Sequence, residues 1–160
     1  MSGPAWLTDE EQRMWRKLVA MTTLLPAALD ARLQREAGLT HFSYWVLAML
    51  SEARDRSLRM SELAARCNSS LSRLSHVVGK LEARGWVRRQ RPADDARGNL
   101  AVLTDEGFAK VVATAPGHVE QVRALVFDRL TLEQVHQIDE ICAALLTELD
   151  PGGRVAALPD

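Results

Sequence analysis

The fold is decided by residues 57–104, which read SLRMSELAARCNSSLSRLSHVVGKLEARGWVRRQRPADDARGNLAVLT. Residues 57–59 are predicted to form a very short strand, and Ser61 is predicted to cap a short helix over 62–66. Cys67-Asn68 then makes a tight turn. A second helix follows this turn directly.

The second helix is predicted to begin at Ser69 or Ser70 and to run to Arg84. Gly85 follows in the position where glycine commonly closes a helix. Two strands, 86–91 and 99–103, are separated by a turn-rich stretch and form a hairpin. Helix, tight turn, helix and hairpin is the order of a winged helix-turn-helix.

The two faces of the second helix differ in chemistry. At about 100° per residue, one side is apolar and the other is small, polar and basic. The apolar positions are Leu71, Leu74, Val78 and Leu81. The predicted DNA-contacting positions are Ser69, Ser70, Ser72, Arg73, His76 and Lys80. Short hydroxyls let a helix enter a major groove closely, Arg73 is long enough to reach guanine edges, and His76 or Lys80 can reach phosphates.

Such a face on a lone helix is usually a solvated surface. Three arginines on the first strand of the hairpin, Arg88, Arg89 and Arg91, add positive charge beside it. At the hairpin tip Asp95 precedes Arg97 by two residues and can hold the arginine extended, as suits a narrow minor groove. The combination favours DNA recognition, with Arg88, Arg91 and Arg97 as contacts from the wing.

Charge is unevenly distributed along the 160 residues, although the formal net charge is only −1. Residues 54–97 carry 11 Lys and Arg against 5 Asp and Glu, and the rest of the chain is acidic. A basic segment on an acidic body indicates a surface for a polyanion. The 47% hydrophobic share is sufficient for a core.

Helical patterns flank this middle segment. Thr8 and Glu11 form a capping-box signal for a helix to about Glu36, with Pro26 inside it, and Thr40 is a plausible cap for a helix over 42–54. The first helix carries two apolar stripes, one of Leu18, Leu25, Leu29 and Leu33 and one of Leu7, Met14 and Met21. Two stripes imply two buried faces, which a short monomer rarely needs.

The C-terminal third also has helical spacing. One pattern continues unbroken through Pro116 and predicts a single long kinked helix, comprising Phe108, Val112, Ala115, Val119, Val122 and Val126. Thr131 is predicted to cap a last helix whose apolar residues are Val135, Ile138, Cys142, Leu145 and Leu149. Any one stripe is as well explained by packing within the chain. Three long amphipathic helices at the two termini favour self-association.

Several motifs in order resemble the MarR family of bacterial transcriptional regulators. They are Ser72-Arg73-Leu74, Lys80 to Val87, Asp95-Ala96-Arg97 and Leu103 to Gly107. The resemblance implies a mainly α fold with a small β-hairpin wing, and a homodimer with interlocked terminal helices on a pseudo-palindromic operator. It divides this single domain (1–160) into a DNA-binding lobe at 55–104 and dimerisation helices at 8–54 and 105–150. Arg97 becomes the wing arginine, and the family's commonest mode is repression.

The resemblance also implies release from DNA by a small, often aromatic or anionic effector. Family ligands bind where the first two helices meet the lobe, which suggests Trp15, Arg16, His41, Tyr44 and Trp45. Rings beside a histidine can stack on a planar ligand, and protonated His41 or Arg16 can hold a carboxylate. The competing explanation for these aromatic residues is ordinary core packing.

Other classes of protein fit less well. The four histidines and two cysteines have no metal-ligand spacing, and no phosphate loop or nucleophile motif occurs, so neither an enzyme nor a cofactor is expected. The longest apolar run, 44–50, is too short to span a bilayer, and no signal peptide is expected. A cytoplasmic location follows. The alternative function is a winged-helix adaptor that binds protein, although its reading face would be apolar or acidic.

Overall fold

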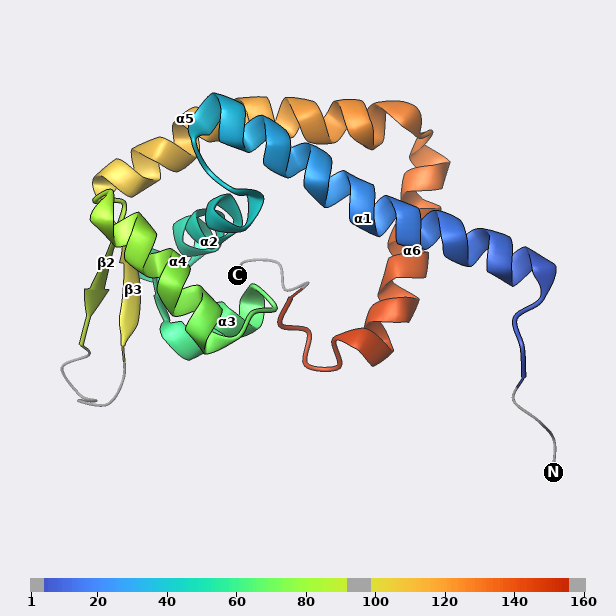
Figure 1. The fold of residues 1–160 in the computed structure, drawn as a ribbon, viewed down its shortest axis with the longest axis horizontal. Coiled ribbons are helices and arrows are strands. Elements are labelled where there is room, and N and C mark those ends of the chain that lie inside the picture. The colour runs from blue at the N-terminus through green and yellow to red at the C-terminus, as the bar shows by residue number, and fades with distance from the viewer. Residues whose placement is uncertain (1–4, 92–98, 156–160) are drawn as a thin grey trace.

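The structure is a computed structural model that describes residues 5–91 and 99–155. It is mainly helical, with a small antiparallel sheet at one end of the molecule (Figure 1). The six α-helices are α1 (Asp9–Ala37), α2 (His41–Glu52), α3 (Met60–Arg66), α4 (Leu71–Ala83), α5 (Asp105–Leu125) and α6 (Leu132–Leu149). The strands are β1 (Ser57–Arg59), β2 (Val87–Gln90) and β3 (Leu100–Leu103), and short 3-10 turns cover Arg54–Arg56 and Phe127–Arg129.

The winged lobe follows the predicted order. β3 lies in the middle of the sheet and pairs antiparallel with β1 and β2, in the order β1-β3-β2. Ser57 lies opposite Val102, and Val87 lies opposite Leu103. Because β1 pairs with β3 as the third strand of the sheet, the segment before α3 is hydrogen-bonded to the wing. The fold class predicted from sequence, mainly helical with a β-hairpin wing, is confirmed.

One predicted helix start is wrong. α3 begins at Met60 after Arg59, and no side chain caps it, so Ser61 lies inside the first turn. The Met60 N–H donates instead to the carbonyl of Asn99, over 2.9 Å, and the Met60 side chain is buried. This tertiary hydrogen bond starts the helix one residue before the serine signal.

The helix predicted over 42–54 ends earlier than expected. α2 stops at Glu52, and the chain passes through left-handed backbone at Asp55 and Arg56. The Arg56 guanidinium forms an ion pair with Asp105 at 3.2 Å and lies 3.7 Å from the centre of the Phe108 ring. These contacts with α5 hold a turn that local sequence does not favour.

The core sits where α2, α3 and α4 meet the inner face of the sheet. Its largest fully enclosed side chains are Val46, Leu47, Leu50, Leu63, Leu74, Val78 and Val87. α5 closes this core through Val111 and Gly107. A Cβ atom on Gly107 would lie 2.0 Å from the carbonyl oxygen of Trp86, so the start of α5 packs directly on the backbone of the hairpin.

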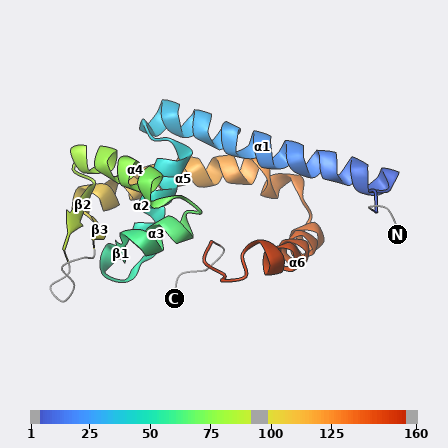
Figure 2. The same ribbon diagram turned by 60° about the horizontal axis from the view of Figure 1, so that its bottom comes forward.

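The terminal helices have the predicted caps. Thr8 and Thr131 each form a complete capping box, with Glu11 and Gln134, and Gly38 ends α1 with φ 65°. α5 is a single helix that contains Pro116, as its periodicity predicts. α1 and α5 run side by side away from the lobe, and α6 turns off the far end of α5 (Figures 1 and 2).

Most of these helices' apolar surface is uncovered within one chain. The stripe of Leu29 and Leu33 in α1 is buried, whereas the second stripe, with Met14 and Met21, is exposed. No residue of α6 is buried. In its predicted apolar stripe Val135 is half-buried, and Ile138, Cys142, Leu145 and Leu149 are exposed. Most of this stripe is therefore uncovered within one chain.

Candidate nucleic-acid interface

The turn between α3 and α4 sets the direction of the reading helix α4. Asn68 adopts left-handed backbone with φ 44°, and the Ser69 N–H donates to the carbonyl of Ala64 over 2.9 Å. Ser70 then caps α4, because its hydroxyl oxygen accepts the N–H of Arg73 over 3.2 Å. The chain therefore turns sharply and presents the first turn of α4 outward.

α4 has the two faces expected from its sequence, with one exception. Leu74, Val78 and Leu81 are buried in the core. The exposed positions on the other side are Ser70, Ser72, Arg73, His76 and Lys80, and Ser69 is half-buried at the preceding turn. Leu71, predicted to lie in the core, is instead 53% exposed. It is the first residue of the helix, directly after the capping Ser70.

Arg73 lies at the edge of this reading face. Its guanidinium carbon is 4.3 Å from the centre of the Phe42 ring on α2, a cation–π contact. The contact positions the arginine beside α2 while leaving the residue exposed. Arg73 is therefore the one predicted DNA contact that also touches the predicted effector region.

The wing contributes further arginines. Arg88 and Arg91 are exposed, as expected for phosphate contacts. Arg97, the predicted minor-groove arginine, lies outside the described residues together with the rest of the hairpin tip. Arg88 is in β2 and Arg91 follows it directly, and Figure 2 shows β2 and β3 at one end of the molecule.

Arg89 has a different role from its two neighbours. Its guanidinium donates to the carbonyl and hydroxyl oxygens of Ser75, over 2.6 and 3.2 Å, and forms an ion pair with Glu82 at 3.4 Å. The Arg89 N–H donates to the same carboxylate over 3.0 Å. Arg89 thus links β2 to the side of α4. The alternation of side chains along the strand does not predict this contact, because it does not show which way β2 faces.

The glycine inside α4 is not required by its surroundings. A Cβ atom on Gly79 would lie 3.8 Å from an Arg89 nitrogen, and that nitrogen is its nearest neighbour. This distance is ordinary van der Waals contact, so alanine also fits there.

The predicted effector residues separate into two groups. His41, Tyr44 and Trp45 lie together on α2, with the His41 and Trp45 ring centres 6.5 Å apart. His118 of α5 joins them, 4.7 Å from Tyr44 and 6.1 Å from His41. Trp15 and Arg16 are exposed on the distal part of α1. Asp30 of α1 lies next to the cluster, because its carboxylate accepts the backbone N–H of His41. Trp15 is about 22 Å along α1 from Asp30, at 1.5 Å per residue, and is therefore far from the cluster.

Burial affects how these groups titrate. It lowers the pKa of His41, and the nearby Asp30 carboxylate only partly offsets this effect. Burial and then His41 lower the pKa of His118. Both imidazoles are therefore mainly neutral at pH 7, which disfavours the predicted role of a protonated His41 in holding a carboxylate.

A hollow joins this aromatic cluster to the reading helix. It is formed by His41, Phe42 and Trp45 on one side and by Cys67, Asn68 and Arg73 on the other, with Pro26 and Val155 at its edges. Its volume is about 620 Å³. Burial raises the pKa of the Cys67 thiol to about 12, so this cysteine remains protonated and packs as an apolar group.

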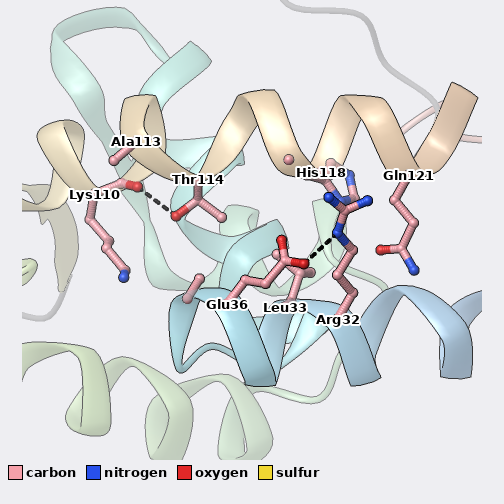
Figure 3. A pocket seen from close by; sticks show the side chains of 10 residues that line it. Arg32, Leu33, Glu36, Lys110, Ala113, Thr114, His118 and Gln121 are labelled. Atoms are coloured by element: carbon pink, nitrogen blue, oxygen red, sulfur yellow. Dashed lines mark hydrogen bonds and ion pairs between the residues drawn. The ribbon is translucent and has the colours of Figure 1, made fainter.

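A smaller cavity of about 160 Å³ lies between α1 and α5 (Figure 3). Arg32 spans its mouth, 2.8 Å from the Glu36 carboxylate and 2.5 Å from Glu120. The His118 Nδ1 and Gln121 Oε1 atoms are buried with no hydrogen-bond partner in the described part of the chain. Sequence reasoning missed His118, because its helix approaches α2 only in the folded chain.

Together, the capped reading helix, the basic wing and the flanking long helices define a winged helix-turn-helix protein of the DNA-binding regulator class. Comparison with known proteins gives the family. A model described as the MarR family matches residues 37–98. The chain is 48% identical to Sco3205 of Streptomyces coelicolor, a MarR family transcriptional regulator solved in complex with DNA, over 94% of each chain and with a TM-score of 0.90.

A second solved relative is AbsC, another MarR family transcriptional regulator of Streptomyces coelicolor. It is 38% identical over 91% of this chain and 98% of its own, with a TM-score of 0.87. The transcriptional repressor YetL of Bacillus subtilis is 30% identical, and the alignment spans 56% of this chain but only 53% of YetL. The chain therefore belongs to the MarR family of transcriptional regulators. Within the described residues, none of the helices is both long and apolar enough to cross a membrane.

Proposed function

We propose that this protein is a repressor that binds a pseudo-palindromic operator as a homodimer. The observation that carries the proposal is the outer face of α4, where the exposed Ser72, Arg73, His76 and Lys80 form a surface without a carboxylate. The nearest acid on the helix, Glu82, is engaged by Arg89. A positive helix face that is free of acids and stands clear of the core suits the major groove.

Individual contacts follow from the reach of each side chain. Ser69, Ser70 and Ser72 line the close-approach edge, and Arg73 reads a base. His76 and Lys80 reach phosphates, while Arg88, Arg91 and Arg97 serve the wing. Two such lobes related by a two-fold axis meet half-sites about one helical turn apart. The lobe at 55–104 is the DNA-binding part, and 8–54 with 105–150 form the dimerisation part.

The uncovered helix faces support the dimer. Apolar side chains are exposed on α1 (Met14, Met21), α5 (Val112, Val119) and α6 (Ile138, Leu145). Exposed apolar surface on this scale marks an interaction site. A second copy of the chain is the partner that the family membership supports.

Selection of duplexes from a random library, followed by affinity measurement, tests the proposal. We expect one enriched pseudo-palindrome. Arg73→Ala should weaken it by about 1–3 kcal/mol and relax one base pair. Lys80→Ala should weaken all sequences alike and reduce the salt dependence. Arg35→Ala removes an exposed charge from α1 that is not among the proposed DNA contacts, and should leave binding unchanged. Failure to enrich any sequence would contradict the proposal.

The same proposal includes release by a small aromatic or anionic effector in the hollow between α2 and α4. A ring stacked on His41 and Trp45 would lie beside Arg73, and could shift the reading helix only by binding the DNA-free arrangement more tightly. In titrations of small aromatic acids, tryptophan quenching should accompany operator release. Trp45→Ala should abolish both responses. A compound that releases DNA equally from wild type and from Trp45→Ala would place the effector elsewhere. A Trp15→Ala variant tests whether the distal part of α1 contributes to effector binding.

The proposal assigns no catalytic activity to the protein and places it in the cytoplasm with its DNA. The opposing adaptor function would require an apolar or acidic reading face. The basic groups on α4 argue against that chemistry.

A further inference from the structure

Leu71 is an isolated apolar side chain on the DNA-binding lobe. It is 53% exposed at the first position of α4. Among the described residues, all other exposed large apolar side chains fall within 6–24 or 112–155, in the terminal segments assigned above to dimerisation or directly next to them. Leu71 lies outside those segments, so dimerisation does not account for its exposure.

The exposed surroundings of Leu71 are mainly polar. It borders a hollow of about 340 Å³ whose other lining residues are the largely buried Met60 and five polar or charged residues, Arg59, Ser61, Ser75, Arg89 and Asn99. Ser75 is four residues further along α4 and therefore lies one turn above Leu71 on the same side. An exposed apolar side chain at the start of the reading helix, bordered by hydroxyl, amide and guanidinium groups, is placed for a ligand whose surface is mostly polar with a small apolar feature.

A major groove presents such a surface. Its base edges are hydrogen-bond donors and acceptors, with the thymine C5 methyl as the apolar exception. We propose that Leu71 is a specificity-determining residue that reads a thymine by its methyl group, once in each half-site. This inference rests on the proposed DNA binding, and it adds a contact that Arg73 and the serines do not make.

Replacement of thymine by deoxyuridine tests the contact, because it removes the methyl and leaves every hydrogen-bonding group in place. The probes are the selected operator duplex and copies with deoxyuridine at symmetric thymine positions. Wild type should lose about fourfold in affinity per half-site at one such position, the effect of one buried methyl. Leu71→Ala should bind the thymine and deoxyuridine duplexes equally, and Leu71→Met should retain the discrimination.

Ser72→Ala is the matched control on the same helix turn. It should bind both duplexes more weakly while keeping the ratio of their affinities. A wild-type protein that tolerates deoxyuridine at every position would overturn the inference but leave DNA binding intact, and so would undiminished discrimination in Leu71→Ala. If no duplex is selected at all, the proposed function fails and this inference falls with it.

Discussion

The lobe at 55–104 buries its apolar side chains within one chain, whereas the terminal helices leave many of theirs exposed. In the lobe Leu63, Leu74 and Val78 have no exposed surface, and the sheet, α3 and α4 close on one another with α2. In α6, by contrast, Ile141 is 58% and Leu149 is 79% exposed. The lobe's conformation is specified by contacts within one chain. The arrangement of the terminal helices requires a surface that one chain does not provide.

The contrast also divides the functional work. The side chains proposed to read DNA stand on an element whose core face is fixed, so their positions relative to one another are rigid. The spacing between two lobes depends on the terminal helices, which one chain leaves largely uncovered. An effector that alters the junction of α2 and α4 therefore acts at the boundary between the two regions.

Truncation after Thr131 should give the largest effect on this contrast. Removal of α6 takes away an apolar surface that is mostly exposed within the chain, so the lobe should stay folded while the dimer is lost. Because two linked half-sites gain from effective concentration, operator affinity should fall about 100- to 10,000-fold. Sedimentation and mobility shift measure the two effects. A truncated protein that still sediments as a dimer would move the interface to α1 and α5.

Gly107→Ala should disrupt the lobe from within. The added Cβ would meet the Trp86 carbonyl oxygen at 2.0 Å, and backbone on both sides must shift. We expect a loss of about 3 kcal/mol in the free energy of unfolding. Urea denaturation followed by circular dichroism measures it. An unchanged free energy of unfolding would contradict the close packing of Gly107 on the backbone of Trp86.

Arg97→Ala and Arg89→Ala test whether the wing acts through α4. Loss of Arg97 alone should cost about 1–3 kcal/mol in operator binding. Arg89→Ala releases β2 from Ser75 and Glu82, so the wing should no longer hold Arg97 in place, and the double variant should be no weaker than Arg89→Ala alone. Additive losses in this double-mutant cycle would mean that Arg89 contributes independently of the wing tip.

Gly79→Ala should raise the free energy of unfolding slightly, whereas Gly107→Ala should lower it. Alanine fits beside Arg89 at 3.8 Å and favours the helix, so unfolding should cost about 1 kcal/mol more. Operator affinity should be unchanged. Thermal denaturation of this variant beside Gly107→Ala contrasts two helical glycines, one structurally required and one replaceable.

The smallest effect concerns pH. Burial lowers the pKa of His41 and His118 in the folded state, so the unfolded chain binds more protons in the range below the ordinary histidine pKa. This contribution to stability is complete above that value and decreases as the pH falls toward the folded-state pKa. His118→Gln should flatten the dependence measured between pH 7 and about 5. The exposed His76→Gln is the control, and an equal flattening in both would contradict the assignment.

How much the sequence predicts depends on whether the signal is local. Thr8, Thr40 and Thr131 act through backbone atoms three residues away, so their caps are predicted correctly. Ser61 fails because Met60 is held by Asn99, a partner 39 residues further along the chain. Leu71 follows the apolar period of α4 yet is exposed as the first residue of the helix. The placement of Arg89 and His118 depends on sheet register and helix crossing, which periodicity does not encode.

Sedimentation of the intact protein, alone and with its selected operator duplex, tests most directly whether two chains make one DNA-binding unit. We predict twice the mass of one chain at micromolar concentration, and two chains on each duplex with both half-sites protected. A folded monomer in solution, together with a complex of one chain per duplex, would contradict the division into a self-sufficient lobe and helices completed by a second copy.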